Sequence, residues 1–415
     1  MMIERTHQYI VRTWERAMLM PKDMEAGFQL PYPCVPPCVT GEFRCLFYWD
    51  TFYTNLGLVA DGKSALAKHN VDNLIYLLNK YGFVPNANSE SGSKWCSQPP
   101  YLHWMVQTLE KYVQDESWLK KAYFALKNEY HFWMTERMTS IGLNRHYHQP
   151  LNKQDLVEYY DYVATERIKI PMNIDDDAKA EKAHSYIAAA ECGLDWTPRF
   201  RDGAAYIIPV DLNANLYGME INLYRWALMF EPDAASKFLE DAEERKCLMN
   251  QYCLDKDGLY YDYDMRTEER NHFFSTSQFM PFVMGLTDDK EALKKLVGIL
   301  QNPFGVVSTQ EDVVENLSYQ WSYPNTWAPD NYLAFLALEK NNLLNEAKTV
   351  ATRYLETVSR NYAKTGLLWE KYDGIDGEVS KKNEYEVPEM LGWTGGVFEV
   401  FYKHIYNECG GFPGE

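Results

Sequence analysis

The distribution of apolar residues along the chain indicates helices in most segments. In SALAKHNVDNLIYLLNK, residues 64–80, five apolar side chains fall on one helical face: Val71, Leu74, Ile75, Leu77 and Leu78. The same spacing, interrupted by polar or Gly/Pro stretches, predicts about twelve helices. A weak one covers 179–190, and the others cover 3–18, 50–60, 64–80, 101–113, 117–136, 211–229, 234–251, 289–300, 330–340, 344–359 and 394–406.

The order of these elements predicts an all-α fold. Strand-like runs such as AAYIIPV, residues 204–210, are short and do not alternate with helices, so no parallel sheet is indicated. No Gly/Ser-rich linker or block of charge divides the chain, whose 415 residues suit one large barrel. We therefore expect residues 1–415 to form a single domain, an (α/α)6 toroid of six helix pairs.

The long segments between the predicted helices are where we expect a functional site, because the connections at one end of a toroid surround a central depression. One of them contains QWSYPNTWAP, residues 320–329, which combines three aromatic rings, two amides and two prolines. The long connections are 20–48, 82–100, 137–178, 191–210, 302–328 and 361–393.

Aromatic residues are unusually frequent in these polar segments. Tyr, Phe and Trp make up 15% of the chain, and many of them lie beside Asn, Asp, Gln and Pro. Aromatic faces among hydrogen-bonding side chains suit a sugar, whose C–H faces stack on rings and whose hydroxyls need donors and acceptors. Any single ring also fits the packing of a wide gap between helices, so only clusters of rings favour a carbohydrate ligand.

Charge and hydropathy narrow the possible partners and the location. The formal net charge is −18, which repels phosphate backbones and anionic membrane surfaces, so neither nucleic acid nor a membrane is an expected partner. The start, MMIERTHQYIVRTWERAM, has the pattern of an amphipathic helix rather than a signal peptide. No later apolar run reaches the ~18 residues of a spanning helix. We therefore expect a soluble, cytoplasmic protein.

Cysteine and histidine spacing favours neither a metal nor a cofactor. Cys34 and Cys38 are close in CVPPC, but there is no second cysteine pair, so reduced structural thiols are expected. His146 and His148 in NRHYHQP could supply half of a metal site, and the sequence offers no further ligands beside them. Phosphate-binding glycine loops, HExxH and GxSxG are all missing from the sequence.

Carboxylates recur with aromatic and amide side chains in five of the polar segments. Asp50 ends GEFRCLFYWD, Glu191 and Asp195 lie in AAECGLDWTPRF, Glu370 lies in GLLWEKYD, and Glu389 lies in EYEVPEMLGWTGG. The fifth segment, residues 82–100, carries Asn86, Asn88, Trp95 and Gln98. Each carboxylate alone is compatible with a helix cap or an exposed turn. Together they fit glycosidic bond hydrolysis, which needs one carboxyl to protonate the leaving oxygen and a second to activate water or to attack.

Several stretches resemble one known family. FRCLFYWDTF, HNVDNLIYLLNKYGFVPN, CSQPP, AAECGLDW, IPVDLN, QWSYPNTWAP, WEKYD and EMLGWTGG occur in the order typical of inverting trehalases with an (α/α)6 barrel. The resemblance extends from about residue 41 to residue 400. It implies that Asp195 is the general acid and Glu370 the base that activates water, with Glu191 as a neighbour that helps to set the site. In an inverting site the two carboxyls are about 6.5–9.5 Å apart, which leaves room for water.

The resemblance and the loop composition together predict the residues that bind a small carbohydrate substrate. They are Phe43, Arg44, Tyr48, Trp49, Asp50, Asn86, Gln98, Glu158, Glu191, Arg199, Gln320, Trp321, Asn325, Trp327, Glu389 and Trp393.

The chain departs from the family pattern on the leaving-group side. The family has an arginine before SQPP where this chain has Cys96. It also has an Arg-Pro-Glu run before the acid, and in DLVEYY, the nearest equivalent, Leu156 stands where the arginine would be. Trehalose is therefore expected to be either a poor substrate or held by other donors, such as Lys94, Arg145 or Arg167.

Two alternative functions remain compatible with the sequence. One is a related (α/α)6 glycosidase that acts on glucosylglycerate, mannosylglycerate or an oligosaccharide. The other is a sugar-binding protein without activity, which has no need for both Asp195 and Glu370.

Overall fold

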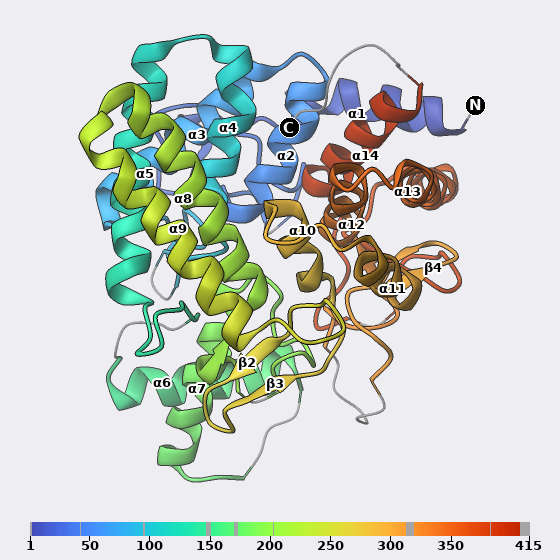
Figure 1. The fold of residues 1–415 in the computed structure, drawn as a ribbon. Coiled ribbons are helices and arrows are strands. Elements are labelled where there is room, and N and C mark those ends of the chain that lie inside the picture. The colour runs from blue at the N-terminus through green and yellow to red at the C-terminus, as the bar shows by residue number, and fades with distance from the viewer. Residues whose placement is uncertain are drawn as a thin grey trace.

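The computed structural model describes residues 2–41, 43–93, 96–146, 151–169, 173–201, 203–312, 319–381 and 383–406. This part of the chain is mostly helical (Figure 1). Its α-helices are α1 (Met2–Ala17), α2 (Tyr48–Ala60), α3 (Ser64–Tyr81), α4 (Leu102–Val113), α5 (Glu116–Glu136), α6 (Lys153–Tyr162), α7 (Asp176–Glu191), α8 (Val210–Phe230), α9 (Pro232–Tyr252), α10 (Met280–Met284), α11 (Lys290–Leu300), α12 (Ala328–Lys340), α13 (Leu344–Thr365) and α14 (Gly392–Tyr406).

Six of these helices form a closed inner ring. In ring order they are α2, α4, α8, α10, α12 and α14, each in contact with the next, and α14 packs back on α2. The remaining partners, α1, α3, α5, α9, α11 and α13, pack against the outside of the ring. This arrangement is the predicted (α/α)6 toroid, and the blue and red ends of the chain meet where the ring closes (Figure 1).

Apolar patterning explains which helices are inside. The α2 sequence, YWDTFYTNLGLVA, is buried from Tyr48 to Val59, and α12 is buried from Ala328 to Leu338. Outer helices such as α11 bury one stripe only, with Ala292, Leu293, Leu296, Val297 and Leu300 facing inward. A helix that is buried on all sides is apolar all around, so its sequence does not alternate between an apolar and a polar face. The inner helices are therefore recognised by their overall apolar character.

All twelve predicted helices are confirmed, and two additional ones were missed. One missed helix is α6, which packs against α7 as a hairpin beside the ring and buries only Leu156, Val157 and Tyr160. The other missed helix, α10, has five residues with a proline in its first turn. Both helices are too short or too polar to show a clear period of 3.6 residues.

Short strands pair within and between the loops that precede the inner helices α8, α10, α12 and α14. One antiparallel sheet contains β1 (Ile207–Ile208), β2 (Asp262–Asp264) and β3 (Glu269–Asn271), and β4 (Gln301–Asn302) pairs with β5 (Gly305–Val306). The third pair joins β6 (Asn325–Trp327) to β7 (Lys371–Asp373), with Trp327 opposite Lys371. This register fastens the QWSYPNTWAP loop to the WEKYD stretch.

The closure of the ring depends on a close approach of two helix backbones. A Cβ on Gly57 of α2 would lie 2.5 Å from the Cα of Gly396 on α14. A Cβ on Gly396 would overlap the carbonyl oxygen of Tyr53 on α2. Glycine at both positions therefore lets the first and last inner helices pack at backbone distance.

We expect Gly396→Ala to destabilise the fold by at least about 2 kcal/mol, because the new methyl group meets backbone rather than a side chain that could move. Gly298→Ala is the matched control, since a methyl group at this exposed position on α11 would have no atom within 4 Å. The control should be stabilised by about 0.5–1 kcal/mol through helix propensity. Thermal unfolding of the two variants would show opposite shifts, and equal shifts would contradict the close-packing argument.

Candidate active site

Glu370 is placed immediately before β7 and its carboxylate has two fixed partners. The Lys371 ammonium contacts Oε2 at 2.6 Å, and the Tyr385 hydroxyl donates to Oε1 at 2.7 Å. The Trp393 indole nitrogen donates to the Glu370 carbonyl oxygen at 3.1 Å, which connects the stretch to the start of α14. Glu370 is only 3% exposed. Its two oxygens are therefore held in defined directions.

Asp195 lies in the loop after α7 and faces a different set of groups. Nη2 of Arg167 is 3.4 Å from its Oδ2 atom. Its side chain is 28% exposed, yet the surrounding protein removes enough water to raise the pKa of Asp195 to about 6. Arg167 opposes this shift, and the Glu370 charge adds to it. Two carboxyls 175 positions apart in sequence thus act on each other electrostatically.

Asp50 is the third carboxyl of this cluster. It lies in the first turn of α2 and is buried. The pKa of Asp50 is raised to about 8, mainly by burial and also by the charges of Glu370 and Asp195, while a local backbone hydrogen bond opposes the shift. A carboxyl that is protonated near neutral pH can donate a hydrogen bond to a sugar hydroxyl as well as accept one.

Four tryptophans form one wall beside Glu370. Trp321 and Trp327 stack face to face with ring centroids 3.8 Å apart and planes 5° apart. Trp393 is edge-on to both, at 6.0 and 5.6 Å, and Trp49 is 5.6 Å from Trp321. The QWSYPNTWAP loop therefore supplies two stacked rings, and α2 and α14 each add one ring at their first turn. Such a wall suits the C–H face of a sugar.

Glu384 was not predicted and lies in the same cluster. Nη2 of Arg167 is 3.1 Å from its Oε2 atom, and the Gln320 backbone N–H donates to Oε1 at 3.4 Å. Burial raises the pKa of Glu384 to about 8, although Arg167 opposes the shift. The stretch EYEVPEM contains three glutamates, and spacing alone does not indicate which one faces inward.

Glu389, which was predicted from this stretch, faces another direction. Its Oε1 atom accepts a hydrogen bond from the Tyr9 hydroxyl on α1 at 2.9 Å. The structure therefore places Glu389 between the site loops and the outer ring, and places Glu384 against Arg167.

Several of the remaining predicted residues contact the side chains and backbone around Glu370 rather than Glu370 itself. Gln98 accepts from the Trp49 backbone N–H at 3.0 Å, and Phe43 is 5.7 Å from the Tyr385 ring. Gln320 donates to the Tyr385 hydroxyl at 3.1 Å and accepts from Lys371 at 3.0 Å. These contacts position the groups that surround Glu370.

Other predicted residues maintain the loops themselves. Asn325 donates to the Gln320 carbonyl at 2.7 Å and accepts from Ser380 at 2.6 Å. The backbone of Asn86 pairs with Cys96 and Tyr48, at 2.9 and 3.0 Å. Arg44 donates to the Val39 carbonyl.

Tyr48, Arg199 and Glu158 are predicted site residues that the structure does not bring to the carboxyl cluster. Tyr48 is buried with its hydroxyl against Glu129 and the Leu102 N–H. The Arg199 guanidinium donates hydrogen bonds to Asp211 and Asp262, with one contact of 2.7 Å to each. Glu158 lies exposed on α6 and accepts from Gln154 at 2.8 Å. Their sequence motifs resemble those of the family, but in the structure their side chains make other contacts, away from the carboxyl cluster.

Glu191, four residues before Asp195, forms a buried ion pair. The Arg137 guanidinium donates to both of its oxygens, at 2.9 Å each, and the Ser97 backbone N–H donates at 3.1 Å. Nδ1 of His146 is 3.5 Å away. Burial opposes ionisation, but Arg137 and His146 overcome it and lower the pKa of Glu191 to about 2. His146 is thus committed to Glu191, and His148 lies outside the described residues.

The structure changes the expectation for the leaving-group side. Cys96 is buried beside Glu191 and Asp195, as the motif position implied. Leu156 is buried in α6 and does not take the place of a site arginine. Arg167, the last residue of the short π-helix Val163–Arg167 that follows α6, contacts Asp195 and Glu384 instead. Arg145 donates to the Ala205 carbonyl at 2.9 Å, and Lys94 lies outside the described residues.

A family model described as Trehalase matches residues 3–406. Two periplasmic trehalases, from Xanthomonas oryzae pv. oryzae and Xanthomonas campestris pv. campestris, are each 30% identical over 390 and 392 residues. Each match covers 89% of this chain and 67% of the relative. Their names contradict the prediction of a cytoplasmic location and point to the periplasm. Charge and apolar run length govern solubility, and they do not distinguish two aqueous compartments.

Solved structures agree in fold. The neutral trehalase Nth1 from Saccharomyces cerevisiae superposes with a TM-score of 0.77 at 23% identity, over 97% of this chain and 80% of that one. A GH63 mannosylglycerate hydrolase from Thermus thermophilus superposes with a TM-score of 0.64 at 14% identity, over 96% of this chain and all of that one. Among the described helices, none combines the length and apolar character needed to cross a bilayer.

The Glu191–Arg137 pair makes stability depend on acidity. The pKa of Glu191 falls from an unfolded value of 4.5 to about 2 on folding. Its contribution, about 3 kcal/mol, is therefore present above pH 4.5 and is lost as the pH falls toward 2. Glu191→Gln should be destabilised at pH 7 by about 3–5 kcal/mol, because Arg137 is left buried without its partner.

Thermal unfolding of the wild type and Glu191→Gln between pH 7 and pH 3 tests this, with Glu158→Gln as the exposed control. The difference between wild type and Glu191→Gln should narrow with falling pH, while the control follows the wild type. A difference independent of pH would contradict the assigned pKa.

Proposed function

Because the chain belongs to the trehalase family of glycoside hydrolases, we propose that it hydrolyses trehalose with inversion at the anomeric carbon, residues 1–415 forming one catalytic domain. The observation that carries this proposal is the pairing of Asp195 and Glu370 across the ring. They come from loops on different sides of the toroid, yet the charge of Glu370 acts on Asp195. Trp393 donates to the Glu370 backbone, and Arg167 contacts the Asp195 carboxylate.

We assign Asp195 as the general acid. With a pKa of about 6, it holds a proton in a useful fraction of molecules near neutral pH. It gives this proton to the glycosidic oxygen as the bond to the anomeric carbon breaks. The leaving glucose then departs as a neutral alcohol, and Asp195 is left ionised beside Arg167.

Glu370 is assigned the general base. It takes a proton from a water molecule, whose oxygen attacks the anomeric carbon from the face opposite the leaving group. Lys371 and Tyr385 orient the Glu370 carboxylate toward that water. One water is consumed and two glucose molecules are released. Attack from the opposite face converts the α-linked carbon to β-glucose.

Arg167 is assigned to the leaving glucose. A guanidinium carries five N–H donors, and here it lies between Asp195 and Glu384 and 4.5 Å from the Trp196 ring centroid. This position supports a role for Arg167 as the donor that replaces the arginines expected near Cys96 and Leu156. We therefore favour trehalose over α-glucosides that lack a second glucose.

A substrate panel with anomer-resolved proton NMR tests the function. The value of kcat/KM for trehalose should exceed those for kojibiose, maltose, sucrose, glucosylglycerate and mannosylglycerate. During the first turnovers, β-glucose should appear before mutarotation, together with an equal amount of α-glucose from the leaving group.

Each contrary outcome has a distinct meaning. Preference for a glycerate glycoside would move the chain to the alternative glycosidase function. Release of α-glucose alone would exclude inversion. Binding of trehalose without any hydrolysis would indicate a sugar-binding protein.

Removal of either carboxyl should stop the reaction without unfolding the protein. Asp195→Asn and Glu370→Gln should each lower kcat by about 10²–10⁴-fold, because each variant loses one proton-transfer group. Glu158→Gln is the matched control, since that glutamate is exposed on α6. Steady-state kinetics with circular dichroism would check both points, and a folded Asp195→Asn or Glu370→Gln variant with near wild-type kcat would refute its assignment.

The pH dependence of kcat/KM should reflect the role of Asp195 as the general acid. The acid must be protonated, so kcat/KM should fall as the pH rises through the pKa of Asp195, about 6. In the residual activity of Glu370→Gln, this alkaline limb should move to lower pH, because the charge that raises the pKa of Asp195 is gone.

A further inference from the structure

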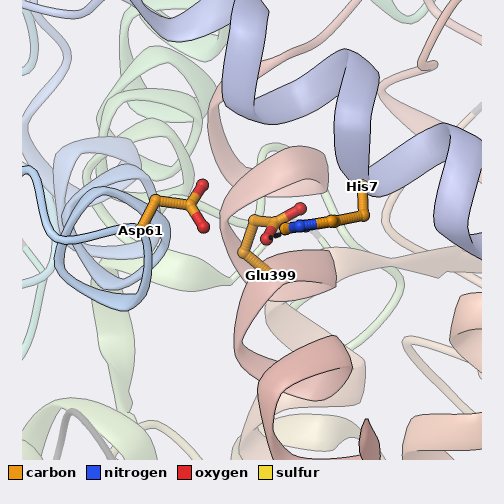
Figure 2. Close-up of side chains that lie close together, drawn as sticks. All are labelled: His7, Asp61 and Glu399. Atoms are coloured by element: carbon orange, nitrogen blue, oxygen red, sulfur yellow. Dashed lines mark hydrogen bonds and ion pairs between the residues drawn. The ribbon is translucent and has the colours of Figure 1, made fainter. Parts of the chain in front are cut away.

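Three potential metal ligands meet at the seam where the ring closes. His7 comes from α1, Asp61 directly follows α2, and Glu399 comes from α14 (Figure 2). Asp61 follows the end of α2 opposite to Asp50, about 16 Å away along the helix. The group is therefore separate from the carboxyl cluster that carries the proposed reaction.

Two carboxylate oxygens in this group are buried without a hydrogen-bond donor. The side chains of Asp61 and Glu399 are 1% and 0% exposed. One oxygen of each is satisfied, by the Trp14 indole at 2.8 Å and by Nδ1 of His7 at 2.7 Å. The other two, Oδ1 of Asp61 and Oε1 of Glu399, have no hydrogen-bond partner among the residues that the structure describes. A buried carboxylate oxygen without a partner is costly, so a bound cation would stabilise the group.

The chemistry of the three ligands indicates which cation fits. The ligating atoms all lie within 4.8 Å of one another. A bound zinc ion has ligand distances of about 2.0–2.2 Å, so its ligand atoms lie at most about 4.4 Å apart, and the three side chains would have to draw slightly closer together to coordinate it. An imidazole beside two carboxylates suits zinc or a similar transition ion, whereas calcium and magnesium prefer sites made of oxygen.

We propose that His7, Asp61 and Glu399 bind one divalent transition-metal ion, with zinc as the best match. The ion takes the place of the missing hydrogen-bond partners of the two buried oxygens, and a water molecule completes the coordination on the side of His7, whose side chain is 16% exposed. The His7 ring is held in plane by stacking on Tyr402, with centroids 4.1 Å apart. The site ties the outer helix α1 to both inner helices of the seam.

Lys403 is the competitor for this site. Its ammonium is 3.6 Å from Oδ1 of Asp61, and its side chain is 33% exposed. A lysine stem is flexible enough to move into solvent when a divalent ion arrives. Removal of this lysine should therefore strengthen metal binding rather than weaken it, which a purely structural role for the cluster does not predict.

The test uses the full-length protein stripped with a chelator and titrated calorimetrically with zinc sulfate. The wild type should bind one equivalent and gain at least about 2 °C in Tm. His7→Gln and Glu399→Gln should lose this binding, and Lys403→Met should bind at least about tenfold more tightly. The control is His272→Gln, because that exposed histidine is 3.7 Å from Asp255 and, in the part of the chain that the structure describes, belongs to no group of three potential metal ligands. Binding in this variant should equal that of the wild type.

Cobalt(II) provides a second readout that does not depend on stability. One equivalent should give visible absorption of a bound ion in the wild type and Lys403→Met, and not in Glu399→Gln. A stripped wild-type protein that takes up neither ion would overturn the proposal, because a shared proton would then satisfy the carboxyl pair. Retention of one equivalent by both His7→Gln and Glu399→Gln would overturn it as well.

Discussion

The packing of α14 on α2 is the constraint on which the rest of the molecule depends. Gly57 and Gly396 let the two backbones approach each other, and this contact closes the inner ring. The closure also places the first turns of both helices together. Trp49 and Asp50 from one helix thereby meet Trp393 from the other, and their ring and carboxyl groups surround Glu370.

The candidate active site is a largely buried cluster of acidic groups with few compensating cations among the described residues. Asp50, Asp195, Glu370 and Glu384 act on one another, while Arg167 and Lys371 supply the contacting positive charges. Like charges in a poorly solvated space cannot all ionise, so the pKa values of some members rise. In this way the fold can hold a proton on one carboxyl near neutral pH, which a general acid requires. The same effect provides protonated carboxyls for hydrogen bonds to a sugar.

Many residues of the recognisable motifs serve the scaffold rather than the ligand. Arg199 joins two carboxylates from separate elements, and Glu191 accepts hydrogen bonds from the buried Arg137 guanidinium. Asn325 holds the turn of its own loop. Such groups need partners because they are buried, and their partners come from distant parts of the chain. A motif can therefore be required for catalysis although only some of its side chains reach the substrate.

The sequence by itself determined the helices and the chemistry of the loops. Periodic apolar spacing is local information, so it predicted twelve helices, and the combination of rings, amides and carboxylates indicated a sugar and a carboxyl pair. The tertiary structure decided which side chains meet. It places Glu384 against Arg167 and Glu389 against Tyr9, and of the donors named from the sequence it brings Arg167 to Asp195. It also gathered His7, Asp61 and Glu399 from both ends of the chain. These outcomes depend on strand register and ring closure, which bring together residues hundreds of positions apart and leave no periodic trace in the sequence.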